Sequence, residues 1–177
     1  MNIEDIKHLA TKTLTGADIL KLVNDKANIM NYREFQKYDN IYDAMGPHKA
    51  LILLYETKKN FGHWTLVFED CDGNIQHFDS YGYKPDKEQG FVPKNFKKNH
   101  YNKIPHLVRL LYESGEPIHY SQYKLQSTKK DISTCGRWVA LRLLLRCLNE
   151  DEFKKLMTTP KGINPDYLVT MITEPFL

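Results

Sequence analysis

The pattern of hydrophobic and polar positions predicts a group of strands in the middle of the chain. Residues 48–57 contain the apolar run Ala-Leu-Ile-Leu-Leu-Tyr, which is typical of a central strand covered on both faces. Residues 64–69 and 75–81 flank Asp-Cys-Asp-Gly-Asn, a sequence that favours a hairpin turn. A further strand is expected over 118–126, where apolar and polar residues alternate. These strands predict a small, mainly antiparallel sheet.

Helices are predicted before and after these strands. The stretch 135–149 is apolar on nearly every side apart from three arginines, so a helix there must be largely buried. Shorter helices are expected over 2–13, from Thr15 or Gly16 onward, and over 104–114, 151–158 and 165–173. Residues 28–47 and 83–103 are expected to be irregular surface segments. The sequence therefore predicts one α+β domain over 1–177, with the sheet packed on helices.

Composition and charge narrow the class of protein. The 177 residues are 41% apolar and 27% charged, a balance that excludes wholesale disorder and allows a sizeable core. No stretch approaches eighteen apolar residues, so no membrane span is expected. The net charge of +3, from 25 basic and 22 acidic residues, is too small to indicate a dedicated nucleic-acid-binding protein.

The cysteines are few and irregularly spaced. Cys71, Cys135 and Cys147 do not suggest a disulfide framework, and the acidic start of the chain does not resemble a signal peptide. We therefore expect all three thiols to be reduced, in an intracellular reducing compartment. No CxxC pair is present, and no metal site is expected.

Cys135 is the candidate nucleophile. It lies where a polar loop meets the buried helix, and a thiol at a helix N-terminus is stabilised as the thiolate by the helix dipole. Gly136 after it would leave room for a substrate backbone. The alternative is that Cys135 is a small buried apolar residue, as most free cysteines are. Cys71 is expected in the hairpin turn and Cys147 in the core.

His63 and Asp79 are the candidate base and its orienting acid. A three-residue loop at 71–73, with Gly73 in the left-handed conformation, would pair Asp70 with Asn74. His63 and Asp79 would then share one face of the hairpin, diagonal to each other. A histidine oriented by a carboxylate is the second half of a nucleophile–base–acid triad. His77, which shares that face, is the only rival base.

Gln126 is a candidate for stabilising an oxyanion. It ends the last predicted strand, before the loop that leads to Cys135. Its amide can donate to the negative oxygen that forms when a thiolate attacks a carbonyl, beside the backbone N–H of Cys135.

The order Gly-His63-Trp64, Asp79, Gln126, Cys135-Gly136 resembles the cysteine proteases of the adenain and ubiquitin-like-protein (SUMO) protease group, clan CE. The resemblance covers residues 48–148. It implies an α+β protease fold, with His63 as base, Asp79 as its orienting acid, Cys135 as nucleophile and Gln126 in the oxyanion hole. It also implies that Trp64 flanks the substrate channel.

The sequence departs from the family pattern in the nucleophile loop. Eight residues separate Gln126 from Cys135, more than the family usually has. Thr134 stands where the family usually has an aspartate, and Asp131 is an alternative for that role.

The resemblance implies a cysteine endopeptidase that cleaves capsid or other precursor proteins of a virus, virophage or Maverick-type element. A deubiquitinating or deSUMOylating isopeptidase is the alternative, and an inactive binding module with a protease fold is a weaker one. The expected enzyme is a monomer without a cofactor or a membrane partner, in the host cytoplasm, the viral factory or the virion. Family members can be stimulated by DNA or a peptide, and six lysines over 84–103 would suit a polyanion.

Overall fold

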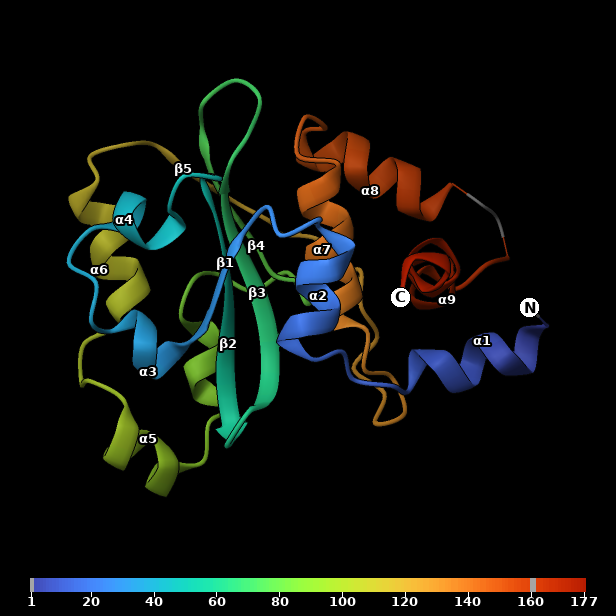
Figure 1. The fold of residues 1–177 in the computed structure, drawn as a ribbon, viewed down its shortest axis with the longest axis horizontal. Helices are drawn as coiled ribbons and strands as arrows, with labels where there is room; N and C mark the ends of the chain where they lie inside the picture. The colour runs from blue at the N-terminus through green and yellow to red at the C-terminus, as the bar shows by residue number, and fades with distance from the viewer. Residues whose placement is uncertain (1, 160–161) are drawn as a thin grey trace.

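The computed structural model of the protein describes residues 2–159 and 162–177, and its centre is a five-stranded sheet with helices on both faces (Figure 1). The strands are adjacent in chain order: β1 (Asn28–Asn31), β2 (Ala50–Lys58), β3 (Phe61–Glu69), β4 (Ile75–Phe78) and β5 (Ile118–Tyr120). The central pairs β2–β3 and β3–β4 are antiparallel, whereas the edge pairs β1–β2 and β4–β5 are parallel. The predicted α+β class is confirmed, with a sheet that is mixed at its edges.

The parallel edges arise from the two segments predicted to be irregular. Parallel neighbours need a crossover connection, and each of these segments supplies one. The first contains β1 itself and the short helices α3 (Tyr32–Phe35) and α4 (Ile41–Met45). The second contains the 3-10 helix η1 (Lys87–Gly90) and the helix α5 (Lys94–His100), and the helix predicted over 104–114, α6 (His106–Glu113), follows it. The strand predicted over 118–126 is shorter, because pairing with β4 ends at Tyr120.

The helices form a layer on each face of the sheet (Figure 1). One layer contains α2 (Gly16–Leu22) and α7 (Cys135–Leu144), with α1 (Ile3–Ala10), α8 (Glu150–Thr158), α9 (Pro165–Thr173) and the 3-10 helix η2 (Glu174–Phe176) around them. The other layer contains α3, α4 and α6. Each layer of helices packs on the sheet to form a separate hydrophobic core. Successive side chains of β2 point into the two cores in turn: Leu51 lies in the core under α6 and Ile52 in the core under α7. Because both faces of β2 are covered, its apolar run is continuous.

The β3–β4 hairpin has the predicted register. Asp70 donates its N–H to Asn74 O at 2.9 Å, and Gly73 adopts the left-handed conformation at φ 86°. Leu66 pairs with Phe78 and Glu69 with Ile75. The ladder ends at Phe78, so the strand predicted over 75–81 is shorter, and Asp79 is the first residue after it. The prediction that the His63 and Asp79 side chains share one side of the hairpin is confirmed by their contact, because His63 Nε2 lies 2.9 Å from Asp79 Oδ2.

Gly62, which precedes His63, is required by the close approach of β2. A Cβ atom built at Gly62 would lie 1.9 Å from Tyr55 O, so any side chain would force the two strands apart. The register of β2 against β3 shifts at this point, between Glu56 and Lys58. The glycine thus allows the irregularity at which β3 brings His63 to the end of the sheet.

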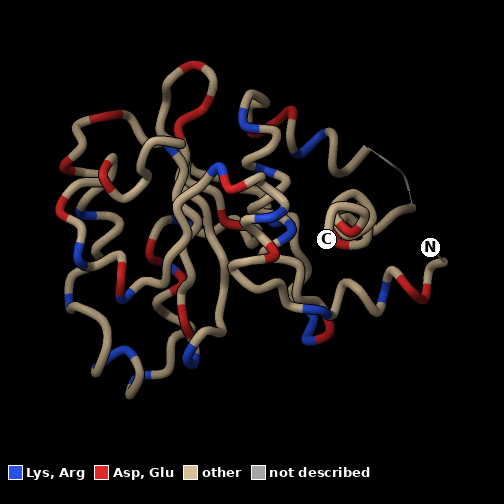
Figure 2. The backbone as a smooth tube through the Cα atoms, viewed as in Figure 1, with Lys and Arg blue, Asp and Glu red and all other residues tan. Residues whose placement is uncertain are grey.

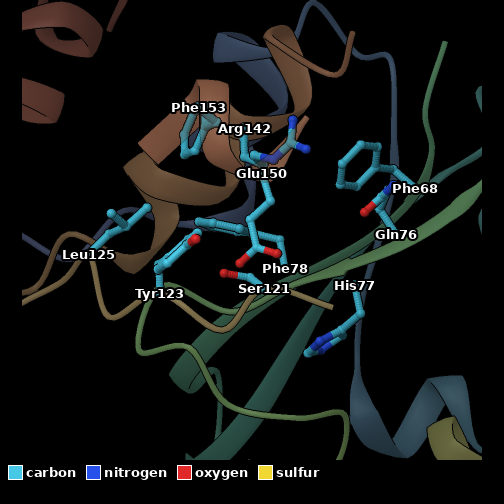
Figure 3. Close-up of a pocket in the computed structure, with 10 residues that line it drawn as sticks. All are labelled: Phe68, Gln76, His77, Phe78, Ser121, Tyr123, Leu125, Arg142, Glu150 and Phe153. Carbon is cyan, nitrogen blue, oxygen red and sulfur yellow. The ribbon is translucent and has the colours of Figure 1, made fainter. Parts of the chain in front are cut away.

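The buried helix α7 ends earlier than its apolar pattern predicts, because Arg142 caps it. The guanidinium donates to Leu145 O and Leu148 O at 3.0 Å each, and it lies 4.7 Å from the Phe68 ring and 5.1 Å from the Phe153 ring. Burial lowers the pKa of Arg142 to about 10. Arg142, Phe68 and Phe153 are among the residues that line a small cavity of about 10 Å³, which has room for about one water molecule (Figure 3).

The cysteines differ from the sequence prediction in two respects. Cys71 and Cys147 form a disulfide, with a Cα–Cα distance of 4.9 Å, so the expectation that all three cysteines are reduced is wrong for this pair. Cys147 is also exposed rather than in the core, because α7 ends at Leu144 and the chain then turns toward the hairpin. Cys135 remains a free, buried thiol.

We expect protein purified without reductant and then denatured to expose one reactive thiol per chain, that of Cys135. Cys71→Ser and Cys147→Ser should each expose two, because each leaves the partner of the disulfide unpaired. Closing the loop between the two cysteines should stabilise the fold by about 4 kcal/mol. Thiol titration and urea unfolding with and without reductant measure both effects. Three reactive thiols in the unmutated, non-reduced protein would contradict the disulfide.

Candidate active site

His63 and Asp79 form a buried hydrogen-bonded pair at one end of the sheet. His63 Nε2 lies 2.9 Å from Asp79 Oδ2, and the Asp79 side chain is fully buried. Asp79 Oδ1 accepts the N–H of Tyr81 at 2.6 Å. Both carboxylate oxygens are therefore engaged, which holds the imidazole through Nε2 and leaves Nδ1 as the ring nitrogen available to another group.

Electrostatics favour the protonated form of His63. Burial by itself disfavours the imidazolium, but the Asp79 carboxylate and the nearby Cys135 thiol outweigh it and raise the pKa of His63 to about 10. The pKa of Asp79 is lowered despite its burial, because His63 stabilises the carboxylate. The pair is thus an imidazolium and a carboxylate at neutral pH.

Tyr81 fixes the plane of the imidazole. Its ring stacks on His63 with a centroid distance of 4.7 Å and an interplanar angle of 19°. The phenol oxygen accepts a hydrogen bond from Gln126 Nε2 at 3.3 Å. Burial and the surrounding acidic groups raise the pKa of Tyr81 to about 12, so the phenol is neutral at physiological pH. The sequence register places Tyr81 opposite His63 but does not indicate that the two rings stack.

Cys135 is the first residue of α7 and lies beside His63. The residue is 6% exposed, and it lies close enough to His63 to contribute to the raised pKa of the imidazole. The first amides of a helix have no acceptor within the helix, so the backbone N–H groups at this end are free to donate to a ligand. The structure thus brings the predicted nucleophile, base and acid into one cluster.

Asp166 holds the loop that leads to Cys135. From α9, its Oδ1 accepts hydrogen bonds from Thr134 Oγ1 at 2.5 Å and from Trp138 Nε1 at 2.9 Å. Its Oδ2 accepts the N–H of Ser127 at 2.8 Å. The carboxylate thereby joins the start of the loop to its end and to α7. Sequence analysis missed Asp166, which lies 31 residues beyond Cys135 with no local motif around it.

The position at which the resembled protease pattern has an aspartate is thus filled by a threonine that binds a distant aspartate. Thr134 is fully buried and donates to Asp166, whereas Asp131 is exposed on the loop. Asp131 therefore does not replace the missing residue.

Gln126 lies against the same cluster and is held by two neighbours. Its Oε1 accepts the Ser80 hydroxyl at 2.6 Å, and its Nε2 faces the Tyr81 hydroxyl. The backbone N–H groups of Leu125 and Gln126 both donate to Ser80 O at 2.9 Å. Ser80 therefore fixes Gln126 from both its side chain and its backbone. No sequence motif indicated this role of Ser80.

A hollow of about 340 Å³ opens in front of the cluster. Its walls come from the N-terminal segment, the β2–β3 end, the β4 exit and the nucleophile loop. The residues that line it are Thr13, Thr57, Phe61, Gly62, His63, Tyr81, Tyr83, Phe91, Gln126, Thr128, Ile132, Ser133 and Cys135. We call this space the Cys135 hollow.

A second hollow of about 500 Å³ adjoins the first. The two share Thr13, Phe61 and Gly62 as lining residues. Trp64 lines only this second space, and its Nε1 donates to Leu14 O at 3.3 Å. Trp64, predicted to flank the substrate channel, therefore lines the neighbouring space and not the Cys135 hollow itself. We call this second space the Trp64 hollow.

Gly136 has a different surrounding from the one that its sequence position suggests. A Cβ atom built there would lie 3.0 Å from Ile19 Cδ1 and 3.1 Å from Leu14 Cβ. Both neighbours belong to the N-terminal part of the chain that packs on α7. The expectation that Gly136 leaves room for a substrate backbone is therefore corrected: the missing side chain allows α2 to pack closely on α7.

His77 is not brought to the thiol. It is 1% exposed, neither of its ring nitrogens has a hydrogen-bond partner in the part of the chain that the structure describes, and burial lowers its pKa to about 4. Figure 3 shows its ring turned away from the other labelled side chains, toward the opposite face of the sheet. The rival base is therefore a neutral, enclosed imidazole.

Metal-ligating clusters and membrane spans are not found among residues 2–159 and 162–177. No group of three or more His, Cys, Asp or Glu side chains in these ranges is arranged to hold a metal ion. No helix within them is long and apolar enough to cross a membrane.

Three solved structures are similar to the chain over most of its length. The central domain of the uncharacterized Lpg1148 protein from Legionella pneumophila has a TM-score of 0.42 and 15% identity, and the match covers 93% of this chain and 95% of that one. The ASFV pS273R protease has a TM-score of 0.46 and 16% identity, and the match covers 92% of this chain and 67% of the protease. ChlaDub1 from Chlamydia trachomatis has a TM-score of 0.39 and 14% identity, and the match covers 99% of this chain and 89% of ChlaDub1.

No model of a known protein family matches the sequence. The uncharacterized protein V9 of Sputnik virophage is 39% identical over 174 residues, which cover 97% of this chain and 99% of V9. The chain therefore belongs to the same family as the virophage protein V9, which confirms the relation to virophage proteins that the sequence resemblance implies.

Proposed function

We propose that this chain is a cysteine endopeptidase that cleaves capsid or other precursor proteins of the element that encodes it. The observation that carries the proposal is the His63–Asp79 hydrogen bond of 2.9 Å beside a free, buried thiol at the first residue of a helix. Gln126 lines the same hollow, and the motif order supports the same assignment.

The proposed reaction is acyl transfer through a thioester. The Cys135 thiolate attacks the carbonyl carbon of a peptide bond, and the carbonyl oxygen becomes an oxyanion. Gln126 Nε2 and the Cys135 backbone N–H donate to that oxygen. The His63 imidazolium then gives its Nδ1 proton to the leaving amine as the C–N bond breaks. Asp79 stabilises the imidazolium throughout, through Nε2.

Hydrolysis of the thioester returns the enzyme to its starting state. Neutral His63 takes a proton from a water molecule, whose oxygen attacks the acyl carbon. The C–S bond breaks, the acid product leaves, and Cys135 and His63 are again a thiolate and an imidazolium. No cofactor takes part in these steps.

The walls of the two hollows favour an extended peptide substrate. The Cys135 hollow is apolar on the side of Tyr83, Phe91 and Ile132, and Phe91 is 55% exposed at its rim. The Trp64 hollow continues the depression on the other side of Gly62. A substrate chain lying across both would place its scissile bond near Cys135, between two apolar surfaces.

We also propose that the enzyme acts where virus particles assemble and in the packaged particle. We further propose that DNA or a peptide stimulates the enzyme by binding near α5. Figure 2 shows basic residues along α5 with no acidic residue among them, and Lys94, Lys98 and Lys103 are exposed. This surface is suited to a polyanion.

Cys135→Ala should reduce cleavage of precursor protein by at least about 10⁴-fold, and His63→Ala should do nearly the same, because each removes a member of one catalytic unit. His119→Ala is the matched histidine control, since His119 is exposed on β5, and it should leave the rate unchanged. Thermal unfolding of each variant tests that the fold is kept. Full activity of a folded Cys135→Ala protein would exclude the proposed nucleophile.

Gln126→Ala should lower kcat by about 100-fold to 1,000-fold with little change in KM, because the oxyanion exists only in the transition state. The matched control is Gln122→Ala, which alters an exposed side chain on the same segment. Steady-state kinetics on a precursor-derived peptide separate the two constants. Equal kcat values for the two variants would assign the oxyanion site elsewhere.

The alternative substrate class is tested with ubiquitin and SUMO probes that carry a thiol-reactive group at the C-terminus. We expect no labelling of Cys135 by these probes, and specific cuts in co-encoded structural proteins when the products are mapped by mass spectrometry. Robust labelling of Cys135 would instead favour the isopeptidase. Absence of both labelling and cleavage, in protein whose Cys135 is intact, would favour the inactive binding module.

A further inference from the structure

A second buried acid lies behind the His63–Asp79 pair. Glu88, on η1, is fully buried, and neither of its carboxyl oxygens receives a hydrogen bond from the residues that the structure describes. An ionised carboxylate enclosed without donors would cost several kcal/mol. A protonated carboxyl avoids that cost, but its O–H then needs an acceptor.

Asp79 supplies that acceptor. The Asp79 carboxyl adjoins that of Glu88, and each shifts the pKa of the other: that of Glu88 is raised well above its ordinary value, chiefly by burial and then by Asp79, while that of Asp79 stays low. Asp79 already accepts one hydrogen bond on each oxygen, from His63 and from the Tyr81 N–H. Each carboxylate oxygen can accept two, so a lone pair remains for Glu88.

The chain around Glu88 is held in a conformation that points this side chain inward. Asp86 has a left-handed backbone at φ 64°, which a non-glycine residue adopts only when its surroundings enforce it. Its carboxylate accepts hydrogen bonds from Tyr55 Oη at 2.9 Å, from Gln89 Nε2 at 3.1 Å and from the Val108 N–H at 2.9 Å. These bonds tie η1 to β2 and α6.

We propose that Glu88 is a positioning residue of the candidate site: its carboxyl is protonated at neutral pH and donates a hydrogen bond to the Asp79 carboxylate. The proton stays on Glu88 throughout, so Glu88 forms and breaks no covalent bond during turnover. The hydrogen bond holds the Asp79 carboxylate with a third donor, besides His63 and the Tyr81 N–H. This role rests on the proposed peptidase function, whereas the protonation state of Glu88 does not.

The groups that face Glu88 agree with a neutral acid. Asp79 and His63 lie on the sheet side, and Tyr55 of β2 is a phenol whose pKa is raised well above its ordinary value by burial and by Asp86. Asp86, two residues earlier, is engaged with its own donors. Neutral His77 shares the strand face that leads to Asp79. His63 is the one cation among these groups, and it pairs with Asp79 and not with Glu88.

The protonation state is measured directly by ¹³C NMR of the glutamate side-chain carboxyl carbons, with the Glu88 signal assigned by its loss in Glu88→Gln. We expect the chemical shift of a protonated acid at pH 7. In Asp79→Asn the Glu88 signal should titrate at lower pH, because the neighbouring charge is gone. A carboxylate shift at pH 7, or a titration unmoved by Asp79→Asn, would overturn the proposal even if the protein cleaves no substrate.

The positioning role is tested by a pair of variants. Glu88→Gln keeps a neutral donor toward Asp79 and should retain kcat within about threefold, whereas Glu88→Leu should lower kcat by about 100-fold with KM little changed. Glu116→Gln and Glu116→Leu, at an exposed position, are the matched controls. Equal kcat values for Glu88→Gln and Glu88→Leu in folded protein would overturn the role. If the unmutated protein is inactive on every substrate, only the proposed function fails, and the NMR titration still decides the state of Glu88.

Discussion

Helix α7 is packed against β3 on one side and against α2 and α9 on the others, and this burial sets where its first residue lies. Trp138 and Val139 are fully buried, so the helix cannot slide or rotate without opening the core. Its N-terminus therefore meets the end of β3 at one fixed place. Cys135 reaches His63 because two hydrophobic surfaces meet there, and not because of any bond between the two residues.

The polar groups around this core are satisfied by contacts between distant segments. Asp166 from α9 accepts hydrogen bonds from both ends of the nucleophile loop and from Trp138. Asp79 accepts from His63 and Tyr81, and Asp86 accepts from β2, η1 and α6. Each of these three buried carboxylates thus has several donors. Among residues 2–159 and 162–177, Glu88 is the buried acid without a donor, and a carboxyl in that situation is stable as the neutral acid.

The candidate site combines a rigid part with an assembled part. His63 lies on β3 and Asp79 directly follows β4, so the antiparallel β3–β4 pair holds both side chains at one end of the sheet. The walls of the two hollows come from the N-terminal segment, the β2–β3 end, the segment after β4 and the nucleophile loop. A strand pair positions a proton-transfer group accurately, while loops supply surface that can differ among relatives. The proposed reaction thus depends on the strand pair, whereas the preference for a substrate depends on the residues that line the two hollows.

The sequence by itself determined the features that depend on local rules. Alternation along β3 and β4 together with Gly73 in the turn predicted the register, and hence that His63 and Asp79 share a face. The apolar circumference of 135–149 predicted a buried helix with Cys135 at its start. Only the tertiary structure decided the rest: the parallel edge strands, the disulfide between Cys71 and Cys147, the packing role of Gly136 and the clamp by Asp166. These features join residues far apart in the chain, and no periodicity or turn chemistry encodes which distant partner a side chain will meet once two cores have closed around the sheet.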